Sequence, residues 1–197
     1  MNIEITNIPV LETKHYLLRG IKEEDAKTLL LFMGDKKTMQ YITPHPVRTE
    51  SEMREEIAKY LKRFAEKKEI PWVILNKKTK EVVGQFRFHK LDLWHRKTEM
   101  GAIIREEYQK KGVMTEILEA VLEFGFHKLQ LNRIVGDIFA GNKGSKKLME
   151  KFGFQKEGVL RQTDFDGLHY HDTVVYSMLK REYEKKMQQV SENNWLM

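Results

Sequence analysis

Apolar positions recur at intervals of two, or of three to four, residues and divide the chain into predicted strands and helices. Residues 16–21 form a predicted strand, and residues 23–33 carry apolar side chains at helical spacing. Residues 35–47 contain Pro44 and Pro46 and are predicted to form a loop. Thr49 followed by Glu52 is a capping-box pattern, so a second helix is expected to begin there.

Three β-rich runs follow the second predicted helix and are separated by turn-like residues. They cover residues 72–75, 82–88 and 98–105. Strands joined by such short connections predict an antiparallel meander.

The clearest helical pattern covers residues 113–129. Apolar residues such as Val113 and Ile117 recur every four positions, whereas Glu116 and Glu119 lie on the opposite stripe. This pattern predicts one face in the core and one face in water.

A further helix and three strands complete the prediction. Asn142 is a suitable N-cap for a helix that ends at Phe152, and Gly153 stands where a left-handed C-cap is common. Residues 134–139, 154–161 and 173–179 are predicted strands. The order β, α, α, β, β, β, α, β, α, β, β predicts a mixed α/β or α+β sheet with helices on its faces. Residues 1–180 are expected to form a single domain, with residues 181–197 as a charged C-terminal tail.

Composition limits the class of protein. A length of 197 residues suits one large domain, and 41% hydrophobic with 32% charged residues is ordinary for a globular chain. The absence of cysteine excludes disulfides, thiolate metal sites and a cysteine nucleophile, and it suits a cytoplasmic location. No secretory signal is apparent and no apolar run approaches the ~20 residues that span a bilayer, so no membrane association is expected.

The formal charge of +6 favours an anionic ligand or partner. The lysines are spread along the whole chain, however, and form no compact basic patch with interleaved aromatic residues. Direct nucleic-acid binding is therefore not expected.

Residues 98–116 combine the end of a strand, a short loop and the start of a helix. The amides of such a loop and of the first helical turn have no intrahelical partners, and the helix dipole adds positive potential, so the junction can bind phosphate. Gly112 permits close approach of an anion, and Lys110 and Lys111 add positive charge. A solvated lysine turn before an ordinary helix is an equal alternative on these features alone.

Two blocks of sequence resemble one enzyme family. Residues 109–114 (QKKGVM) resemble the Gln/Arg-x-x-Gly-x-Gly/Ala signature of GNAT acetyltransferases, with Met114 in the place of a small residue. Downstream, the pattern of Asn142, Ser145 and Leu148 followed by Gly153 and Phe154 resembles the N-x-x-S-x-x-L…G-F element of the RimJ/RimL-type branch. The resemblance extends over about residues 11–180.

The resemblance implies a GNAT-type mixed, mostly antiparallel, twisted sheet flanked by helices on both faces. It also implies acetyl-coenzyme A as cosubstrate, no metal, and direct attack by a primary amine in a ternary complex, with backbone N–H at a splayed strand stabilising the oxyanion. The residues expected to bind the cofactor are Ile103, Ile104, Arg105, Gln109, Lys110, Lys111, Gly112, Val113, Met114, Thr115, Asn142 and Lys146.

Three residues are candidates for proton transfer. Ser145 resembles the serine thought to protonate the leaving thiolate, with packing at a helix start as the alternative. Asp164 stands where RimL-like sequences carry a glutamate thought to act as base, with a role in a hairpin turn as the alternative. Glu99, on the strand before the loop, is the competing base, and an exposed strand glutamate is its alternative.

Other candidates carry less weight. His169 and His171 lack a recognisable third ligand, so no metal site is predicted. The loop at residues 41–47, and Trp94 with His95 at a hairpin tip, are candidate walls of an acceptor site.

The first hypothesis is an N-acetyltransferase acting on a protein α-amino group or on a small amine such as a polyamine or an amino sugar. Two alternatives remain from other classes of protein: a noncatalytic acyl-coenzyme A binding module and a basic RNA- or ribosome-associated protein. Exposed strand edges would support a homodimer, although no pattern locates its interface.

Overall fold

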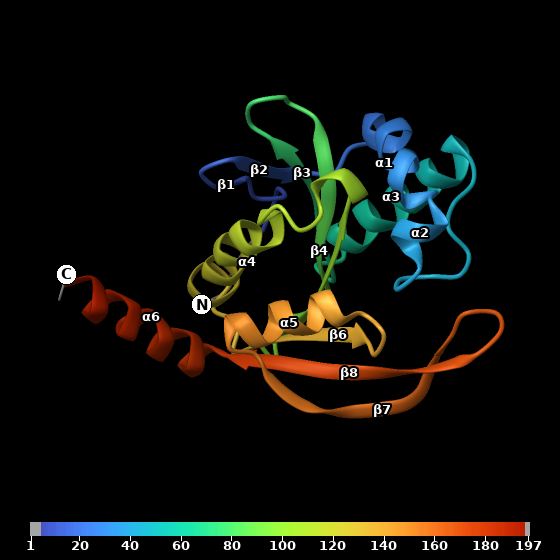
Figure 1. Cartoon of the computed structure of the whole chain (residues 1–197). Helices are drawn as coiled ribbons and strands as arrows, with labels where there is room; N and C mark the ends of the chain where they lie inside the picture. Colours follow the sequence, from blue (N-terminus) through green and yellow to red (C-terminus); the bar gives the residue numbers. More distant parts are fainter. Residues whose placement is uncertain (1–4, 196–197) are drawn as a thin grey trace.

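The computed structural model describes residues 5–195 and, for residues 193–195, only the backbone. Eight strands form one sheet in the order β1-β2-β3-β4-β5-β6-β8-β7 (Figure 1). The strands are β1 (Leu11–Glu12), β2 (Tyr16–Gly20), β3 (Ile70–Asn76), β4 (Val82–Asp92), β5 (Lys97–Ile104), β6 (Arg133–Phe139), β7 (Gln155–Phe165) and β8 (Tyr170–Leu179). Neighbouring strands are antiparallel except for β5 and β6, which run parallel. The predicted mixed, mostly antiparallel sheet is confirmed.

Helices cover the sheet on both faces. They are α1 (Ala26–Met33), α2 (Lys36–Met39), α3 (Glu50–Ala65), α4 (Val113–Glu123), α5 (Lys143–Phe152) and α6 (Lys180–Trp195). A short π-helical segment at Phe124–Lys128 continues α4, so the predicted helix at residues 113–129 is regular only in its first two thirds.

Two hydrophobic clusters match the two faces. The larger one joins α4 and α5 to side chains such as Phe86, Phe88 and Ile134. The smaller one packs α1 and α3 against Val73 and Ile103. Because successive strand residues point to opposite faces, adjacent positions on β4 and β5 belong to different clusters.

The predicted cap residues hold two helix ends. The Thr49 side chain accepts a hydrogen bond from the Glu52 N–H at the start of α3, at 3.2 Å. Gly153 ends α5 in the left-handed conformation, with φ of 86°. These ends therefore form for the local reasons that the sequence indicates.

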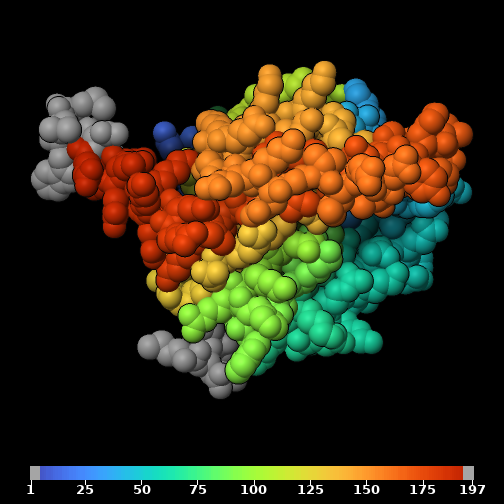
Figure 2. All heavy atoms as spheres, turned by 90° about the horizontal axis from the view of Figure 1, so that it is seen from below, coloured from blue at the N-terminus to red at the C-terminus, as the bar shows by residue number. Residues whose placement is uncertain are grey.

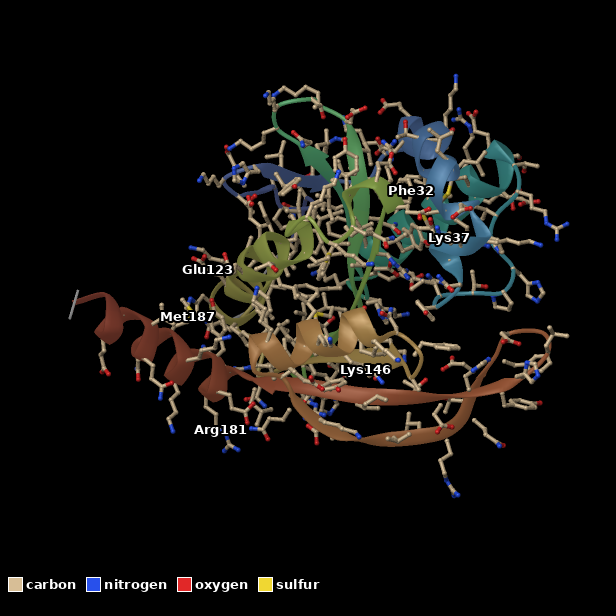
Figure 3. All side chains as sticks on the ribbon, viewed as in Figure 1. Phe32, Lys37, Glu123, Lys146, Arg181 and Met187 are labelled. Carbon is tan, nitrogen blue, oxygen red and sulfur yellow. The ribbon has the colours of Figure 1, made fainter. Side chains whose placement is uncertain are left out.

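Three elements differ from the prediction. The two-residue strand β1 was not predicted, and the predicted loop at residues 35–47 contains the short helix α2, which Asp35 caps by accepting from the Thr38 N–H at 2.7 Å. The stretch that was predicted to be a charged tail begins with α6. Tyr183 on this helix is 6% exposed and stacks on Phe126 with ring centroids 5.0 Å apart, so the first turns of α6 pack on the domain. Farther along, Met187 is exposed on the part of α6 that projects beyond the sheet (Figure 3).

Candidate active site

A cavity of about 380 Å³ opens at the N-terminal ends of α4 and α5, and we call it the helix-end cavity. Its lining comes from α2 and the residues after it, from the end of β5, from the loop before α4, and from the starts of α4 and α5. The lining residues are Lys37, Thr38, Gln40, Tyr41, Ile42, Ile104, Glu106, Tyr108, Gln109, Lys110, Gly112, Val113, Met114, Thr115, Asn142, Gly144, Ser145 and Leu148.

The start of α4 differs from that of α5 in its capping. Asn142 caps α5 by accepting a hydrogen bond from the Ser145 N–H at 3.0 Å. Gly112 occupies the N-cap of α4 with φ of 81° and offers no side-chain cap. The first-turn amides of α4 are therefore free of a side-chain acceptor and lie beside the cavity, an arrangement that suits a phosphate group.

The backbone at Gly112 also leaves space. A side-chain carbon built at this position would meet no atom within 4 Å, so nothing fills the volume next to the loop. Gln109 holds the loop by donating from Nε2 to the Ile104 carbonyl oxygen at 2.9 Å. The residues present thus fit a pyrophosphate-bearing cosubstrate, held by the loop amides and by the charge of Lys110.

Eight of the twelve residues expected to bind the cofactor line the helix-end cavity; they are Ile104, Gln109, Lys110, Gly112, Val113, Met114, Thr115 and Asn142. Ile103 instead packs in the smaller core cluster, on the other face of β5 from Ile104. Arg105 donates to the Val82 carbonyl oxygen at 3.1 Å. Lys111 and Lys146 lie outside this lining, so their contact with the cofactor stays a prediction.

Strands β5 and β6 separate beside this cavity. Their parallel ladder pairs Lys97 with Arg133, Thr98 with Ile134 and Glu99 with Val135, and it then ends, although β5 continues to Ile104 and β6 to Phe139. The facing backbone edges beyond Glu99 have no ladder partner. Backbone N–H groups there are available to a ligand that enters the gap.

A second cavity, of about 450 Å³, lies on the sheet face that carries Glu99, and we call it the strand-face cavity. The lining combines the residues after α2 with β4 to β8: Gln40, Tyr41, Ile42, Thr43, Pro44, Arg87, His89, Lys90, Glu99, Met100, Gly101, Asp137, Phe139, Leu160, Thr163, Asp164, Phe165, Asp166 and Thr173. Figure 2 shows the surface where the β7 and β8 hairpin, in orange and red, runs beside the green β4–β5 region. Gln40, Tyr41 and Ile42 line both cavities and form a common wall.

The three predicted proton-transfer residues divide between these cavities. Ser145 lines the helix-end cavity, whereas Glu99 and Asp164 line the strand-face cavity. The Lys90 Nζ lies 2.8 Å from the Glu99 Oε2. Asp164 accepts hydrogen bonds from the hydroxyls of Thr163, at 3.3 Å, and Thr173.

Two further titratable groups in the lining of the strand-face cavity, His89 and Asp137, have pKa values shifted toward the uncharged form, and no sequence motif pointed to either of them. Burial, and secondarily the charge of Arg87, lowers the pKa of His89 to about 4. The pKa of Asp137 is raised, chiefly by desolvation and then by the negative charge of Glu99. His89 is therefore neutral near pH 7, while Asp137 adds to a crowded set of carboxylates.

Of the two predicted acceptor walls, one lines a cavity and the other does not. The loop at residues 41–47 supplies Tyr41 through Pro44 to the strand-face cavity, and the Tyr41 ring packs on Phe139 with centroids 5.5 Å apart. Trp94 is 87% exposed in the β4–β5 turn and lies outside both linings. Lys37 on α2, labelled in Figure 3, lines the helix-end cavity and forms an ion pair with Glu106. No local pattern singled out Lys37, because it reaches the cavity only through the fold.

Residues 5–195 contain neither a metal-binding cluster nor a membrane-spanning helix. No group of three or more His, Asp or Glu side chains in that range is arranged to hold a metal ion. No helix in the same range combines the length and apolar character of a membrane span.

Comparison with known proteins agrees with this geometry. The family model described as the acetyltransferase (GNAT) domain matches residues 15–155. The chain is 34% identical to the uncharacterized N-acetyltransferase YoaA of Bacillus subtilis (strain 168), over 87% of this chain and 97% of that protein. It is 24% identical to the spermidine N(1)-acetyltransferase of Vibrio cholerae serotype O1 (strain ATCC 39315 / El Tor Inaba N16961), over 84% of this chain and 94% of that protein.

Solved structures share the same fold. The crystal structure of a GNAT-family acetyltransferase from Bacillus anthracis superposes with a TM-score of 0.77 at 25% identity, covering 88% of this chain and all (100%) of that chain. The family model, the YoaA relative and the cavity at the loop before α4 all indicate the same family. The chain belongs to the GNAT family of acetyltransferases, which take acetyl-coenzyme A as acetyl donor.

Proposed function

We propose that this acetyltransferase modifies a primary amine that enters through the strand-face cavity, while acetyl-coenzyme A occupies the helix-end cavity. The observation that carries this proposal is the position of the two cavities. They share the wall formed by Gln40, Tyr41 and Ile42, and they lie beside the gap where β5 and β6 separate. Two reactants in these cavities can therefore meet without a covalent enzyme intermediate.

Acetyl-coenzyme A, when bound, supplies a thioester whose carbonyl carbon accepts the amine. The loop amides from Lys110 onward and the first turn of α4 hold its pyrophosphate. Unpaired backbone N–H groups at the free edge of β5 stabilise negative charge that develops on the carbonyl oxygen. This backbone role depends on the end of the ladder at Glu99.

Residues in both cavities take part in proton transfer. As the new C–N bond forms and the C–S bond breaks, the amine loses a proton to Glu99 or Asp164 in the strand-face cavity. Ser145 gives a proton to the departing sulfur from the helix-end cavity and recovers one from solvent. An aliphatic amine has a pKa near 10.4, so it arrives mainly as the ammonium ion. This ion passes one proton through the carboxylate to solvent before attack, and the amine gives the carboxylate a second proton as the C–N bond forms.

The acceptor in this proposal is a small primary amine or a protein N-terminal α-amino group. The relative named as a spermidine N(1)-acetyltransferase supports the first of these. The expected cytoplasmic location and a homodimer are part of the same proposal.

Release of free thiol from acetyl-coenzyme A tests the proposal. The panel contains spermidine, an amino sugar, an aminoglycoside and a peptide with a free N-terminus, and each product is identified by mass. Amine-dependent thiol release is expected for at least one member. A protein that binds acetyl-coenzyme A but acetylates none of these amines would instead be the noncatalytic binding module.

A further inference from the structure

The strand-face cavity has an excess of negative charge that the whole protein does not share. Carboxylates line it from three strands and one turn: Glu99 on β5, Asp137 on β6, Asp164 on β7 and Asp166 in the turn that follows. The only lysine and arginine residues in this lining are Arg87 and Lys90. Since the complete chain has a formal charge of +6, the local excess of carboxylates is a property of this cavity.

The register of the sheet explains why two of these carboxylates face the same cavity. Glu99 lies opposite Val135 in the parallel pair, and Asp137 follows two positions later on β6. Residues two apart on a strand point to the same face, and so do residues opposite each other in a ladder. Glu99 and Asp137 therefore project from the same face, one on each side of the gap between β5 and β6.

Both cations in the lining are already paired. The Arg87 Nη1 lies 2.8 Å from the Oε1 of Glu69, a residue that is 1% exposed. Lys90 is paired with Glu99 at 2.8 Å. His89 adds no positive charge near pH 7, because its pKa is lowered to about 4. No cation in this lining is left to neutralise a further carboxylate.

Within residues 5–195, the other carboxylates of this lining are paired with cations or with N–H or hydroxyl donors, whereas Asp137 is not. Asp166 accepts from the Leu168 and His169 N–H groups and pairs with His171 at 2.5 Å. Asp164 accepts from two threonine hydroxyls. Among the described residues, no N–H group, hydroxyl, lysine or arginine forms a hydrogen bond or ion pair with the Asp137 carboxylate, and its neighbour is the Glu99 carboxyl, which, after desolvation, helps to raise the pKa of Asp137. Asp137 is exposed to solvent in the cavity and is thus available to a cationic ligand.

The apolar part of the lining suits a hydrocarbon chain between charged groups. Tyr41, Phe139 and Leu160 contribute nonpolar surface to the lining that also carries the carboxylates. An acceptor with one amine needs one carboxylate near the reaction, whereas this cavity offers carboxylates from separate strands. A ligand with several ammonium groups joined by methylene segments fits both features. Its ammonium groups can pair with the separate carboxylates, and its methylene segments can contact the nonpolar surface.

We infer that the acceptor is an aliphatic di- or polyamine and that Asp137 determines this specificity by binding an ammonium group of the acceptor. The inference rests on the proposed function and names its substrate class. Specificity follows because an amine without a second cation leaves Asp137 unpaired, whereas a diamine forms the additional ion pair.

A pair of amines of equal length provides the test. The value of kcat/KM is measured with acetyl-coenzyme A for 1,5-diaminopentane and for 1-aminopentane, and a short lysine-free peptide serves as third acceptor. We expect at least a tenfold preference for the diamine, which falls as ionic strength rises. In Asp137→Asn this preference should shrink about tenfold through KM of the diamine, with a much smaller change in kcat.

Asp92→Asn is the matched control, because it removes the same charge from the end of β4, outside the strand-face cavity. It should retain the diamine preference. Equal kinetic constants for the two amines, turnover of the peptide alone, or an unchanged preference in Asp137→Asn would each overturn the inference while leaving N-acetyltransfer in place.

A binding measurement separates this inference from the proposed function. Spermidine is titrated calorimetrically into the protein with coenzyme A present. Binding by the wild type that weakens at least tenfold in Asp137→Asn supports the acceptor class even if no amine is acetylated. Absence of binding together with absence of diamine turnover would contradict it.

Discussion

Glu99 faces Val135 at the last rung of the parallel ladder between β5 and β6, and the two strands separate immediately beyond this pair. The pair thus marks the point where the sheet opens between the helix-end cavity and the strand-face cavity. Because the strands separate at this pair, Glu99 in the strand-face cavity lies close along β5 to the loop before α4, which lines the helix-end cavity. Ile104, five residues after Glu99, already lines the helix-end cavity.

Gly112→Ala tests the loop. The φ of 81° at Gly112 is unfavourable for alanine by about 1–2 kcal/mol, whereas the added carbon meets no atom within 4 Å. Strain rather than a clash should therefore dominate, and the shifted loop should weaken acetyl-coenzyme A binding roughly tenfold. Calorimetric titration gives the Kd and denaturant unfolding gives the stability.

Gly158→Ala is the control for this variant. A side-chain carbon there also meets no atom within 4 Å, but its φ lies outside the left-handed region. It should leave the Kd unchanged. Equal weakening in both variants would show that the pyrophosphate does not depend on the Gly112 conformation.

Ser145→Ala tests proton transfer to the leaving sulfur. Because Ser145 lines the helix-end cavity and the α5 cap uses its backbone N–H, loss of the hydroxyl leaves the cap intact. We expect kcat to fall roughly 10- to 1,000-fold, with acetyl-coenzyme A affinity nearly unchanged. Ser51→Ala, at an exposed position of α3, should behave as wild type. A wild-type kcat for Ser145→Ala would remove the serine from the mechanism.

Glu99→Gln and Asp164→Asn distinguish the two candidate bases. The variant that lacks the base should lose the acidic limb of the pH profile of kcat/KM, and it should impair strongly basic amines more than weakly basic ones. Glu99 is held by Lys90, and Asp164 by two threonine hydroxyls, so either carboxylate is fixed in place. Profiles that match the wild type in both variants would assign deprotonation to water.

His89 should make the fold less stable in mild acid. Its folded pKa of about 4 lies below the ordinary value of 6.5, so the unfolded chain binds more protons between these two pH values. The contribution of neutral His89 to the free energy of unfolding is fully present above pH 6.5 and is lost as the pH falls toward 4. This loss is on the order of 3 kcal/mol.

Urea unfolding at pH 7 and at pH 4.5 measures this effect. The loss of unfolding free energy between the two pH values should be smaller in His89→Gln than in the wild type. His45→Gln, in the exposed loop before α3, should keep the full loss. A wild-type loss in His89→Gln would mean that other groups cause the acid sensitivity.

Local patterns were sufficient for the main elements and for the loop before α4. The four-residue spacing of Val113 and Ile117 predicted the buried face of α4, and both residues are buried. Asn142 and Gly153 predicted the ends of α5 because capping depends on residues close in sequence. The helix α2 was missed because its four residues carry too little periodicity, and β1 because two residues cannot show alternation.

The strand-face cavity could not be predicted in the same way, because strands far apart in sequence form it. Asp137 and Asp164 come together through the pairing of β6 with β8 and of β8 with β7. Asp137 did give one local signal, since it is the only acidic residue in the strand RIVGDIF. That signal becomes informative only when the register places Asp137 on the same face as Glu99.

Transfer of the acetyl group from acetyl-coenzyme A to an amine across the gap between β5 and β6 should leave two products in equal amounts, free thiol and acetylated amine. Purified protein is incubated with acetyl-coenzyme A and spermidine, and free thiol and acetylated amine are quantified in the same samples. We expect one acetylated amine for each thiol released, at a rate that saturates with both reactants and falls in Ser145→Ala. Binding of acetyl-coenzyme A without amine-dependent thiol release, for spermidine and for every other amine in the panel, would contradict it.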